Sequence, residues 1–564
     1  MPSRTKGGGQ LTKARSSKKL LKTLTDNPAL PAFVRTLKAP VLKRLIDHVG
    51  LHDAGDLIAL TTTEQMRDIF EESLWETLVP GQAERLRPER FLEWLDVMLE
   101  AGAGFTAERL IELGDAFVVM NFQPLITVID ASVAVEHQED GGCMCALCIL
   151  SARDASFEVI GDYVVVGMHD DEWDTVRAAL VEIDGEDAAF LQRVLAQCST
   201  APTMRSFSGQ GQHILDDETY EREQRRERSG FVTPQMAAVF LKATRQTPLD
   251  DLVGQTGYDP VAQRYFEQLA AAAASAAAAA AERERTAAES DDAERSDAGA
   301  ITPVQMRALE AALADAEIIS DRQPQLLAGP QNAREPALEL QARLDRLQMS
   351  APGVFAARLG ELIFLANVLM AGSWYQGGRF TEAEAARAAL ACANLGLDLL
   401  LNEERATSPS QRAQFVETTL EDAPGIVRLF QVGWNLLQAL PMRSAVSLLE
   451  ALRSDHVRAQ LKHKRWMLDE IETAVNDPDI FELIEQGEFA DVADNLVLLS
   501  LVLDARACQC LKTLIADFPR FPQQLNLGFE RAQASTNESH YVSTLQQLNR
   551  IESFLQQLDR LLKL

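Results

Sequence analysis

The chain of 564 residues is 46% hydrophobic and 24% charged, which is typical of a globular protein of about two to four domains and excludes a disordered one. A formal net charge of -29 makes the main surface repel phosphate backbones, so we do not expect the body of the protein to bind nucleic acid. Its seven cysteines, an odd number and unevenly spaced, do not form a disulfide framework and fit a reducing compartment.

Residues 1–26 are predicted to be a disordered basic tail. Up to residue 25 this stretch has no acidic residue, and it contains a run of three glycines. Such a tail can touch an acidic partner, a membrane or nucleic acid, or it can simply be solvated. No apolar core with a cleavage site follows, so we expect no secretory signal and a cytoplasmic protein.

Residues 27–135 are predicted to be a domain of repeated short helices. Pro40 and Pro88 each open an amphipathic helix, and Gly50 and Gly102 end them. Further helices are expected with a cap at Asp53, with a capping box at Thr61 and Glu64, and over residues 106–113 and 115–130. Helices this short cannot bury a face alone, so they should stack as in a helical solenoid.

Part of this domain resembles known helical repeats. The residues concerned are 51–60 (LHDAGDLIAL), Thr63-Glu64-Gln65 and Leu74-Trp75. They are similar to the short-helix repeats in the cytosolic N-terminal domain of bacterial magnesium transporters and in flagellar motor switch proteins. The resemblance implies a helical architecture and transfers no magnesium ligand.

Residues 136–268 are predicted to contain a β-hairpin followed by helices. The segment 156–167 holds two β-branched and aromatic runs around Gly161-Asp162, a pattern that indicates a hairpin. Helices are expected over 171–183 and 186–198. Two more should begin at Thr233-Pro234 and Asp259-Pro260.

Residues 269–300 are predicted to separate two halves of the chain. The positions from 270 to 281 are all alanine except Ser275, and a charged run follows. Alanine favours a helix but buries little surface, so we expect an exposed helix that gives way to a flexible linker over 282–299.

Residues 301–564 are predicted to form an all-helical domain. Thr302-Pro303 opens its first helix, Thr381 and Glu384 have the spacing of a capping box, and 426–440 and 443–452 are expected as two helices. The glycine-rich aromatic loop 372–380 either lines a groove or makes a tight connection between buried helices. The fold class is therefore mainly α, with solenoid-like stacks of helices in two halves and a small β element near 156–198.

Four stretches resemble a bacterial family of uncharacterised proteins labelled a domain of unknown function. They are residues 86–102, 225–243, 365–397 and 430–437, so the resemblance is spread over most of the chain. The family has no assigned activity, and the resemblance supports the architecture alone.

The most specific candidate for chemistry is a cluster of His137, Cys143, Cys145 and Cys148. Three thiolates and an imidazole could bind zinc or an iron–sulfur cluster, or the thiols could cycle through a disulfide. The alternative is that Cys145 and Cys148 are small buried packing residues. A second pair, Cys508 and Cys510, is expected on a helix far away in the sequence.

Other candidates favour structural roles. His48 and His52 are four residues apart, but Gly50 between them predicts a helix end, and their acidic neighbours fit caps and solvated charges. No phosphate loop, nucleophile elbow or zinc-protease helix occurs in the sequence. The apolar runs 117–129 and 496–503 are too short to span a bilayer, so we expect no transmembrane segment.

The sequence therefore predicts a cytoplasmic, non-enzymatic interaction or scaffold protein with an unidentified protein partner. The alternative is a metal-binding or redox-responsive regulator that uses the Cys143, Cys145 and Cys148 cluster.

Overall fold

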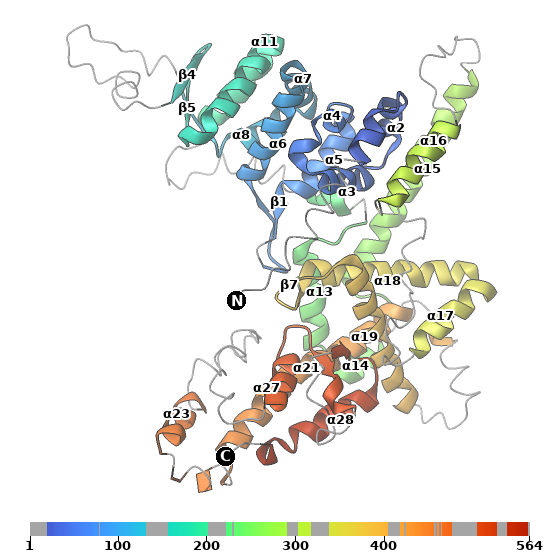
Figure 1. Cartoon of the computed structure of the whole chain (residues 1–564). Coiled ribbons are helices and arrows are strands. Elements are labelled where there is room, and N and C mark those ends of the chain that lie inside the picture. Colours follow the sequence, from blue (N-terminus) through green and yellow to red (C-terminus); the bar gives the residue numbers. More distant parts are fainter. Residues whose placement is uncertain are drawn as a thin grey trace. The chain divides into compact units, whose positions relative to one another are not determined.

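The computed structural model describes most of the chain. The described residues are 20–77, 79–130, 156–200, 222–227, 230–255, 257–289, 303–316, 318, 338–403, 418–421, 425–455, 458–459, 462–463, 465–475, 505–526 and 539–561. They form helices and small sheets of two or three strands, which confirms a mainly α protein with small β elements (Figure 1).

The chain divides into two compact units. Unit 1 contains residues 1–78, 84–225 and 281–323, and unit 2 contains residues 79–83, 226–280 and 324–564. The sequence suggested consecutive domains, whereas the chain passes from one unit to the other at residues 78, 83, 225, 280 and 323.

Unit 1 begins with stacked short helices, which lie beside one another in Figure 1. They are α2 (Leu30–Thr36), α3 (Ala39–Val49), the 3-10 turn η1 (Leu51–Asp53), α4 (Gly55–Ile58), α5 (Thr63–Ser73), α6 (Pro88–Ala101), α7 (Ala103–Leu113) and α8 (Asp115–Phe122). The two-residue strands β1 (Trp75–Glu76) and β2 (Arg85–Leu86) pair between α5 and α6. The proline starts and glycine ends predicted for α3 and α6 are confirmed.

Two predicted caps in this region are wrong. The capping box of α5 uses Thr62 and Gln65, one residue later than predicted, because Thr62 has the extended backbone of an N-cap. Thr61 is buried, and its hydroxyl donates to the Ile58 carbonyl instead. Asp53 makes no capping hydrogen bond at α4, because it lies inside the 3-10 turn η1.

A three-stranded antiparallel sheet replaces the simple hairpin expected from the sequence. The predicted pair is β4 (Phe157–Ile160) and β5 (Tyr163–Gly167), and β3 (Ile126–Asp130) pairs with the other edge of β5. The helix predicted over 115–130 therefore ends at Phe122. The sequence after Pro124 alternates buried and exposed residues with β-branched side chains, a pattern that favours a strand.

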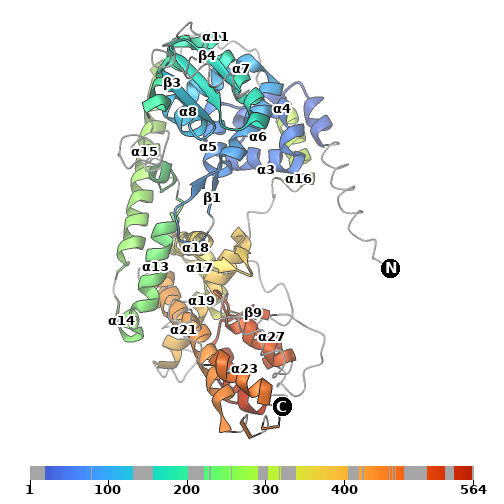
Figure 2. The ribbon, with the colours of Figure 1, turned by 90° about the vertical axis from the view of Figure 1, so that its left-hand side faces the viewer.

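Helix α11 (Asp170–Thr200) packs on this sheet and on α7, as Figure 2 shows. Its backbone is interrupted at Asp187, with φ of -148° and ψ of 86°. The Asp187 carboxylate accepts a hydrogen bond from the Phe190 amide at 2.9 Å and so caps the second half. This kink explains why the sequence pattern predicted two helices here.

The core of unit 1 also includes two segments that were predicted to lie outside it. Leu20 and Leu24 belong to a helical turn and are buried, so the predicted disordered tail over 1–26 is wrong for residues 20–25. Helix α16 (Pro303–Asp315) buries Leu309 and Leu313 in the same core, although its sequence was predicted to start the C-terminal domain.

Helix α15 (Pro260–Glu289) carries the alanine run, and the predicted helix is confirmed. The flexible linker predicted from residue 282 is wrong for residues 282–289, which continue the helix. Glutamate and arginine are good helix formers, so the change from alanine to charge is not a stop signal.

Unit 2 consists of longer helices around one core. They are α13 (Pro234–Gln246), α14 (Leu249–Gly254), α17 (Glu339–Ser350), α18 (Pro352–Gly372), α19 (Glu382–Glu403), α21 (Gly425–Arg453), α23 (Arg465–Val475), α27 (Ala505–Leu514) and α28 (Leu545–Leu555), with the 3-10 turns η3 (Gln523–Leu525) and η4 (Leu558–Arg560). Two antiparallel pairs join them: β6 (Trp374–Tyr375) with β7 (Gly378–Arg379), and β8 (Arg520–Pro522) with β9 (Ser539–Tyr541). The predicted helices 426–440 and 443–452 are one helix, α21, with Pro441 inside it.

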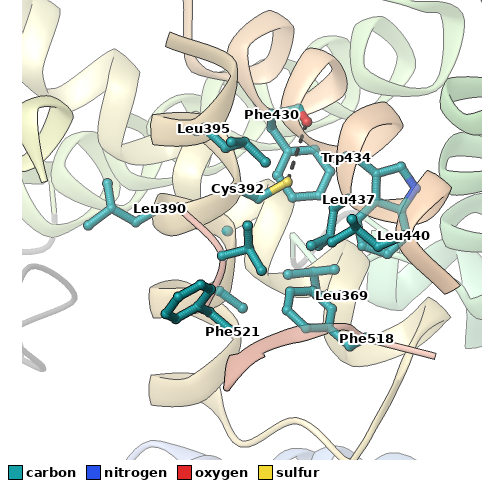
Figure 3. Close-up of a cluster of buried hydrophobic side chains, with 14 of the residues drawn as sticks. Leu369, Leu390, Cys392, Leu395, Phe430, Trp434, Leu437, Leu440, Phe518 and Phe521 are labelled. Carbon is teal, nitrogen blue, oxygen red and sulfur yellow. Dashed lines mark hydrogen bonds between the residues drawn. The ribbon is translucent and has the colours of Figure 1, made fainter. Parts of the chain in front are cut away.

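Helices α19 and α21 approach each other unusually closely. A Cβ atom added to Gly396 would lie 2.0 Å from the Leu429 carbonyl oxygen, and one added to Gly433 would lie 1.9 Å from the Cys392 carbonyl oxygen. Glycine is therefore required at both positions. Figure 3 shows the adjoining core, in which Cys392 faces Phe430 across the helix pair.

One helix among the described residues, α18, is long and apolar enough to cross a membrane by length and composition. It packs instead against α13, α17, α19 and α21 in the core of unit 2. It also carries a buried ion pair between Arg358 and Glu361. The described part of the chain therefore has no clear transmembrane segment.

The Glu361 carboxylate holds several elements together. It accepts hydrogen bonds from the amides of Ile426 at 2.7 Å and Val427 at 3.3 Å, which caps the start of α21, and one from the Tyr258 hydroxyl at 2.6 Å. Burial raises the pKa of Glu361, and Arg358 acts in the opposite direction.

Candidate functional site

A groove in unit 2 has a volume of about 730 Å³. We call it the α13 groove. Its lining comes from residues 79–80, helix α13, residues 372–374 at the start of the β6–β7 hairpin, helix α21 and Asp517.

Helix α13 supplies one wall of the groove. Thr233 caps the helix by accepting a hydrogen bond from the Met236 amide at 3.3 Å, and Pro234 occupies the first turn. Residues 238, 241, 242 and 245 line the groove. Their spacing of three and four places them on one helix face, so this face carries Ala238 and Leu241 beside two basic side chains.

The start of the β6–β7 hairpin supplies another part of the lining. Trp374, the first residue of β6, lines the groove, and the hairpin turns through Gln376 and Gly377, both with positive φ. Tyr375 stacks on Phe380 with ring centroids 4.4 Å apart. Both interpretations of this loop from the sequence therefore hold, since it lines a groove and also connects packed helices tightly.

Hydrogen bonds fix the floor of the groove. Trp434 is 4% exposed and donates its indole N–H to the Leu241 carbonyl at 3.2 Å. Gln438 donates to the Asp517 carbonyl at 3.1 Å. Asn435 donates to the carbonyls of Thr244 and Thr247 at the end of α13. These bonds hold α13 on α21, so the groove is preformed.

Residues 79–83 complete the rim. The Gly81 amide donates to the Ala371 carbonyl at 3.1 Å. Gly81 has a φ of 79°, and an added Cβ would lie 2.8 Å from the Ala238 Cβ atom. Only glycine allows this approach. The contact leaves Val79, which is 42% exposed, at the edge of the groove.

The groove is basic on one side, whereas the whole chain is acidic. Lys242 and Arg245 both lie on the exposed face of α13. Within the described part of the chain, Lys242 has no carboxylate within ion-pair distance. Asp517 is the only acidic residue that lines the groove among those described. The α13 side of the groove therefore offers positive charge.

Among the described residues, no group of three or more His, Cys, Asp or Glu side chains could hold a metal ion. Burial raises the pKa of the Cys198 and Cys510 thiols to about 12 and that of Cys392 well above its usual value. These thiols stay protonated near neutral pH and do not act as nucleophiles.

The metal candidates from the sequence, His137, Cys143, Cys145 and Cys148, lie outside the described residues. Binding of zinc or an iron–sulfur cluster, and redox chemistry at these cysteines, therefore stay predictions. Cys508 and Cys510 lie on α27 as expected. His48 ends α3 and His52 lies in η1.

The match to known proteins concerns the N-terminal part of the chain. Residues 8–144 match the family of unknown function DUF6178. The expected resemblance to an uncharacterised family is thus confirmed over this range. It contains residues 86–102, while the other three stretches that suggested the resemblance lie beyond it. No curated protein and no solved structure gives a significant match.

The DUF6178 match covers most of the stacked helices of unit 1, and of the α13 groove it includes only residues 79 and 80. The resemblance to magnesium transporters and flagellar switch proteins stays a prediction. From the sequence, only the glycine-rich aromatic loop 372–380 was named as a lining of a groove. The other parts of the lining come from segments that are far apart in the chain, so the sequence did not bring them together.

Proposed function

We propose that this protein is a cytoplasmic, non-enzymatic interaction protein and that the α13 groove binds a short segment of a partner protein. The segment carries an apolar anchor side chain next to a carboxylate. The observation that supports this proposal is a preformed groove with an apolar floor and a basic side on a chain of net charge -29.

The apolar part of the groove provides the anchor site. Val79 and the half-buried Trp374 offer aliphatic and aromatic surface. The buried Leu241 and Trp434 complete the apolar lining, and the indole N–H of Trp434 is already bonded within the protein. Fully burying one Leu-sized side chain contributes about 1.5 to 3 kcal/mol. A single anchor of this kind fits weak, reversible binding of a short segment.

The basic side provides selectivity. Lys242 and Arg245 are one turn apart on α13 and favour a carboxylate next to the anchor. Most of the remaining surface is acidic and repels such a segment, so the groove is where an acidic segment should bind. A basic peptide would be attracted elsewhere on the surface and should not select the groove.

Site-specific cross-linking in cells tests the proposal. A photo-reactive amino acid is placed at Lys242 of the full chain, and in a control chain at Lys512, which is exposed on α27 of the same unit. The cross-linked peptide is sequenced, synthesised and titrated against the purified protein with Trp374 fluorescence as the readout. We expect a peptide with an apolar residue beside Asp or Glu, captured at Lys242 and not at Lys512.

Charge reversal completes the test. The double variant Lys242→Glu, Arg245→Glu should weaken binding of that peptide about tenfold or more, whereas Lys512→Glu should leave it unchanged. Equal capture at both positions, capture of a basic peptide, or binding that is insensitive to the double reversal would refute the proposal.

A further inference from the structure

A separate pocket in unit 1 concentrates arginine side chains. It has a volume of about 260 Å³ and lies between α5, the start of α8 and the helical turn at residues 222–227. Arg67, Arg222 and Arg225 all line it, together with the carboxylates Glu71 and Asp115.

Both carboxylates of the pocket are already neutralised. Glu71 pairs with Arg225 at 2.7 Å, and Asp115 pairs with Arg193, which lies outside the pocket lining, at 3.2 Å. Arg222 pairs with Glu84, also outside the lining, at 2.6 Å.

Arg67 is therefore the cation in excess. Its guanidinium donates to the Leu113 carbonyl at 3.2 Å and forms no ion pair with any described carboxylate. The lining thus has three arginines and two carboxylates, and Asp68, which lies outside the lining, interacts electrostatically with Arg67 and Arg225.

Contacts around Arg222 fix its guanidinium at the pocket. The Arg222 side chain is 4% exposed, and its guanidinium carbon lies 4.2 Å from the centroid of the Trp75 ring. It also donates to the Glu71 carbonyl at 2.6 Å. Glu84 balances its charge, so Arg222 would offer an entering anion a fixed hydrogen-bond donor rather than an excess charge.

The turn between α7 and α8 adds amide donors to the lining. Gly114 has a φ of 97° and precedes α8, and residues 114–117 line the pocket. The first amides of a helix have no partner within that helix and favour negative charge. Phe117 and Met120 form an apolar part of the same lining.

We propose that this pocket binds a small phosphate monoester. The arginines and the first amides of α8 would hold the phosphate, and Phe117 and Met120 would contact the ester group. Arg67 would contact the phosphate directly, because it forms no ion pair with a described carboxylate. This site is independent of the partner groove proposed for unit 2.

Calorimetric titration of the full chain at low ionic strength tests this proposal. The probes are phenyl phosphate, inorganic phosphate and benzoate. We expect phenyl phosphate to bind about tenfold or more tightly than inorganic phosphate, because its ring adds apolar contact, and benzoate to bind weakest. Inorganic phosphate binding as tightly as phenyl phosphate would show an anion site without an ester pocket and would overturn the proposal. So would the absence of binding by all three probes.

Variants assign the binding to the pocket. Arg67→Gln should weaken phenyl phosphate about tenfold or more, and Arg67→Lys should restore part of the affinity. Arg90→Gln is the matched control, because Arg90 is an exposed arginine of unit 1 that pairs with Glu93. Asp115→Asn removes a negative charge from the pocket and should strengthen binding, which keeps the test decisive if Arg67→Gln does not fold. Affinities unchanged by both Arg67→Gln and Asp115→Asn would refute the assignment.

Discussion

Both units contain aromatic rings in their cores, but their helix contacts differ. In unit 1, rings lie between short helices: Phe70 lies 5.3 Å from Trp94, and Phe91 lies 5.4 Å from Phe122, measured between ring centroids. In unit 2, where rings also pack, the long helices α19 and α21 meet backbone to backbone at Gly396 and Gly433. A contact filled by rings should be sensitive to lost volume, and one closed on glycine should be sensitive to added volume.

The kind of contact between helices also accounts for the lengths of the helices in the two units. In unit 1, helices α3, α6 and α7 are 11 to 14 residues long, and each ends at a glycine. Helices α19 and α21 each extend over more than twenty residues, because small residues along their contact let the two axes stay close. The α13 groove lies beside such a rigid helix, and the arginine pocket lies where three short elements meet.

The largest effect is expected from loss of a ring in unit 1. Phe91→Ala removes a fully buried side chain and should reduce the free energy of unfolding of unit 1 by about 3 to 5 kcal/mol. Hydrogen exchange read peptide by peptide can assign the loss to unit 1. Val159→Thr, on the exposed side of β4, is the control and should have little effect. If the amides of unit 1 are equally protected from hydrogen exchange in Phe91→Ala and in the parent, the packing described for unit 1 is contradicted.

Next in size is the addition of a methyl group between α19 and α21. Gly433→Ala places a Cβ atom against the Cys392 carbonyl and should destabilise unit 2 by about 3 kcal/mol, since two backbones must separate. Gly360→Ala is the matched control on α18, where an added Cβ meets nothing within 4 Å, and it should be neutral or slightly stabilising. The same exchange experiment measures both. Equal changes in stability for Gly433→Ala and Gly360→Ala would contradict the close approach of α19 and α21.

The smallest effect concerns a buried charge at the start of α15. Burial raises the pKa of Asp259, although its carboxylate accepts hydrogen bonds from the amides of Val261 and Ala262. A raised folded-state pKa means that the folded chain binds the proton more tightly. Its stabilising contribution is present below the unfolded pKa and is lost as pH rises through the folded pKa.

The substitution Asp259→Asn should remove the decrease in stability that accompanies ionisation of Asp259. It should keep the helix cap, because asparagine caps helices about as well as aspartate. The variant should therefore gain stability relative to the parent as pH increases from 4 toward 7. Denaturant unfolding at several pH values, with exchange at the start of α15 as the local readout, measures the difference. A constant difference across that pH range would show that the carboxyl does not titrate as described.

Local signals in the sequence predicted many of the helices but not their partners. Pro88 and Gly102 marked α6 correctly, because proline and glycine restrict the backbone regardless of the rest of the fold. The strand β3 was missed because residues 115–130 were assigned to one helix, although the β-branched residues after Pro124 favour a strand, which pairing with β5 completes. For the candidate site, the sequence predicted the start of α13 at Thr233-Pro234 and named loop 372–380 as one that could line a groove, but it did not indicate that residues 79–83 lie beside them.

By itself, the sequence determined the mainly α fold class, the helical alanine run, the hairpin around Gly161 and the acidic charge that disfavours nucleic acid on the main body. Each of these depends on backbone preference or on total charge, which are properties of residues and their near neighbours. The tertiary structure alone decided that residues 79–83 belong to unit 2, that α16 belongs to unit 1, and that the α13 groove and the arginine pocket exist. These features join residues far apart in the chain, and such contacts leave no periodic pattern in a single sequence.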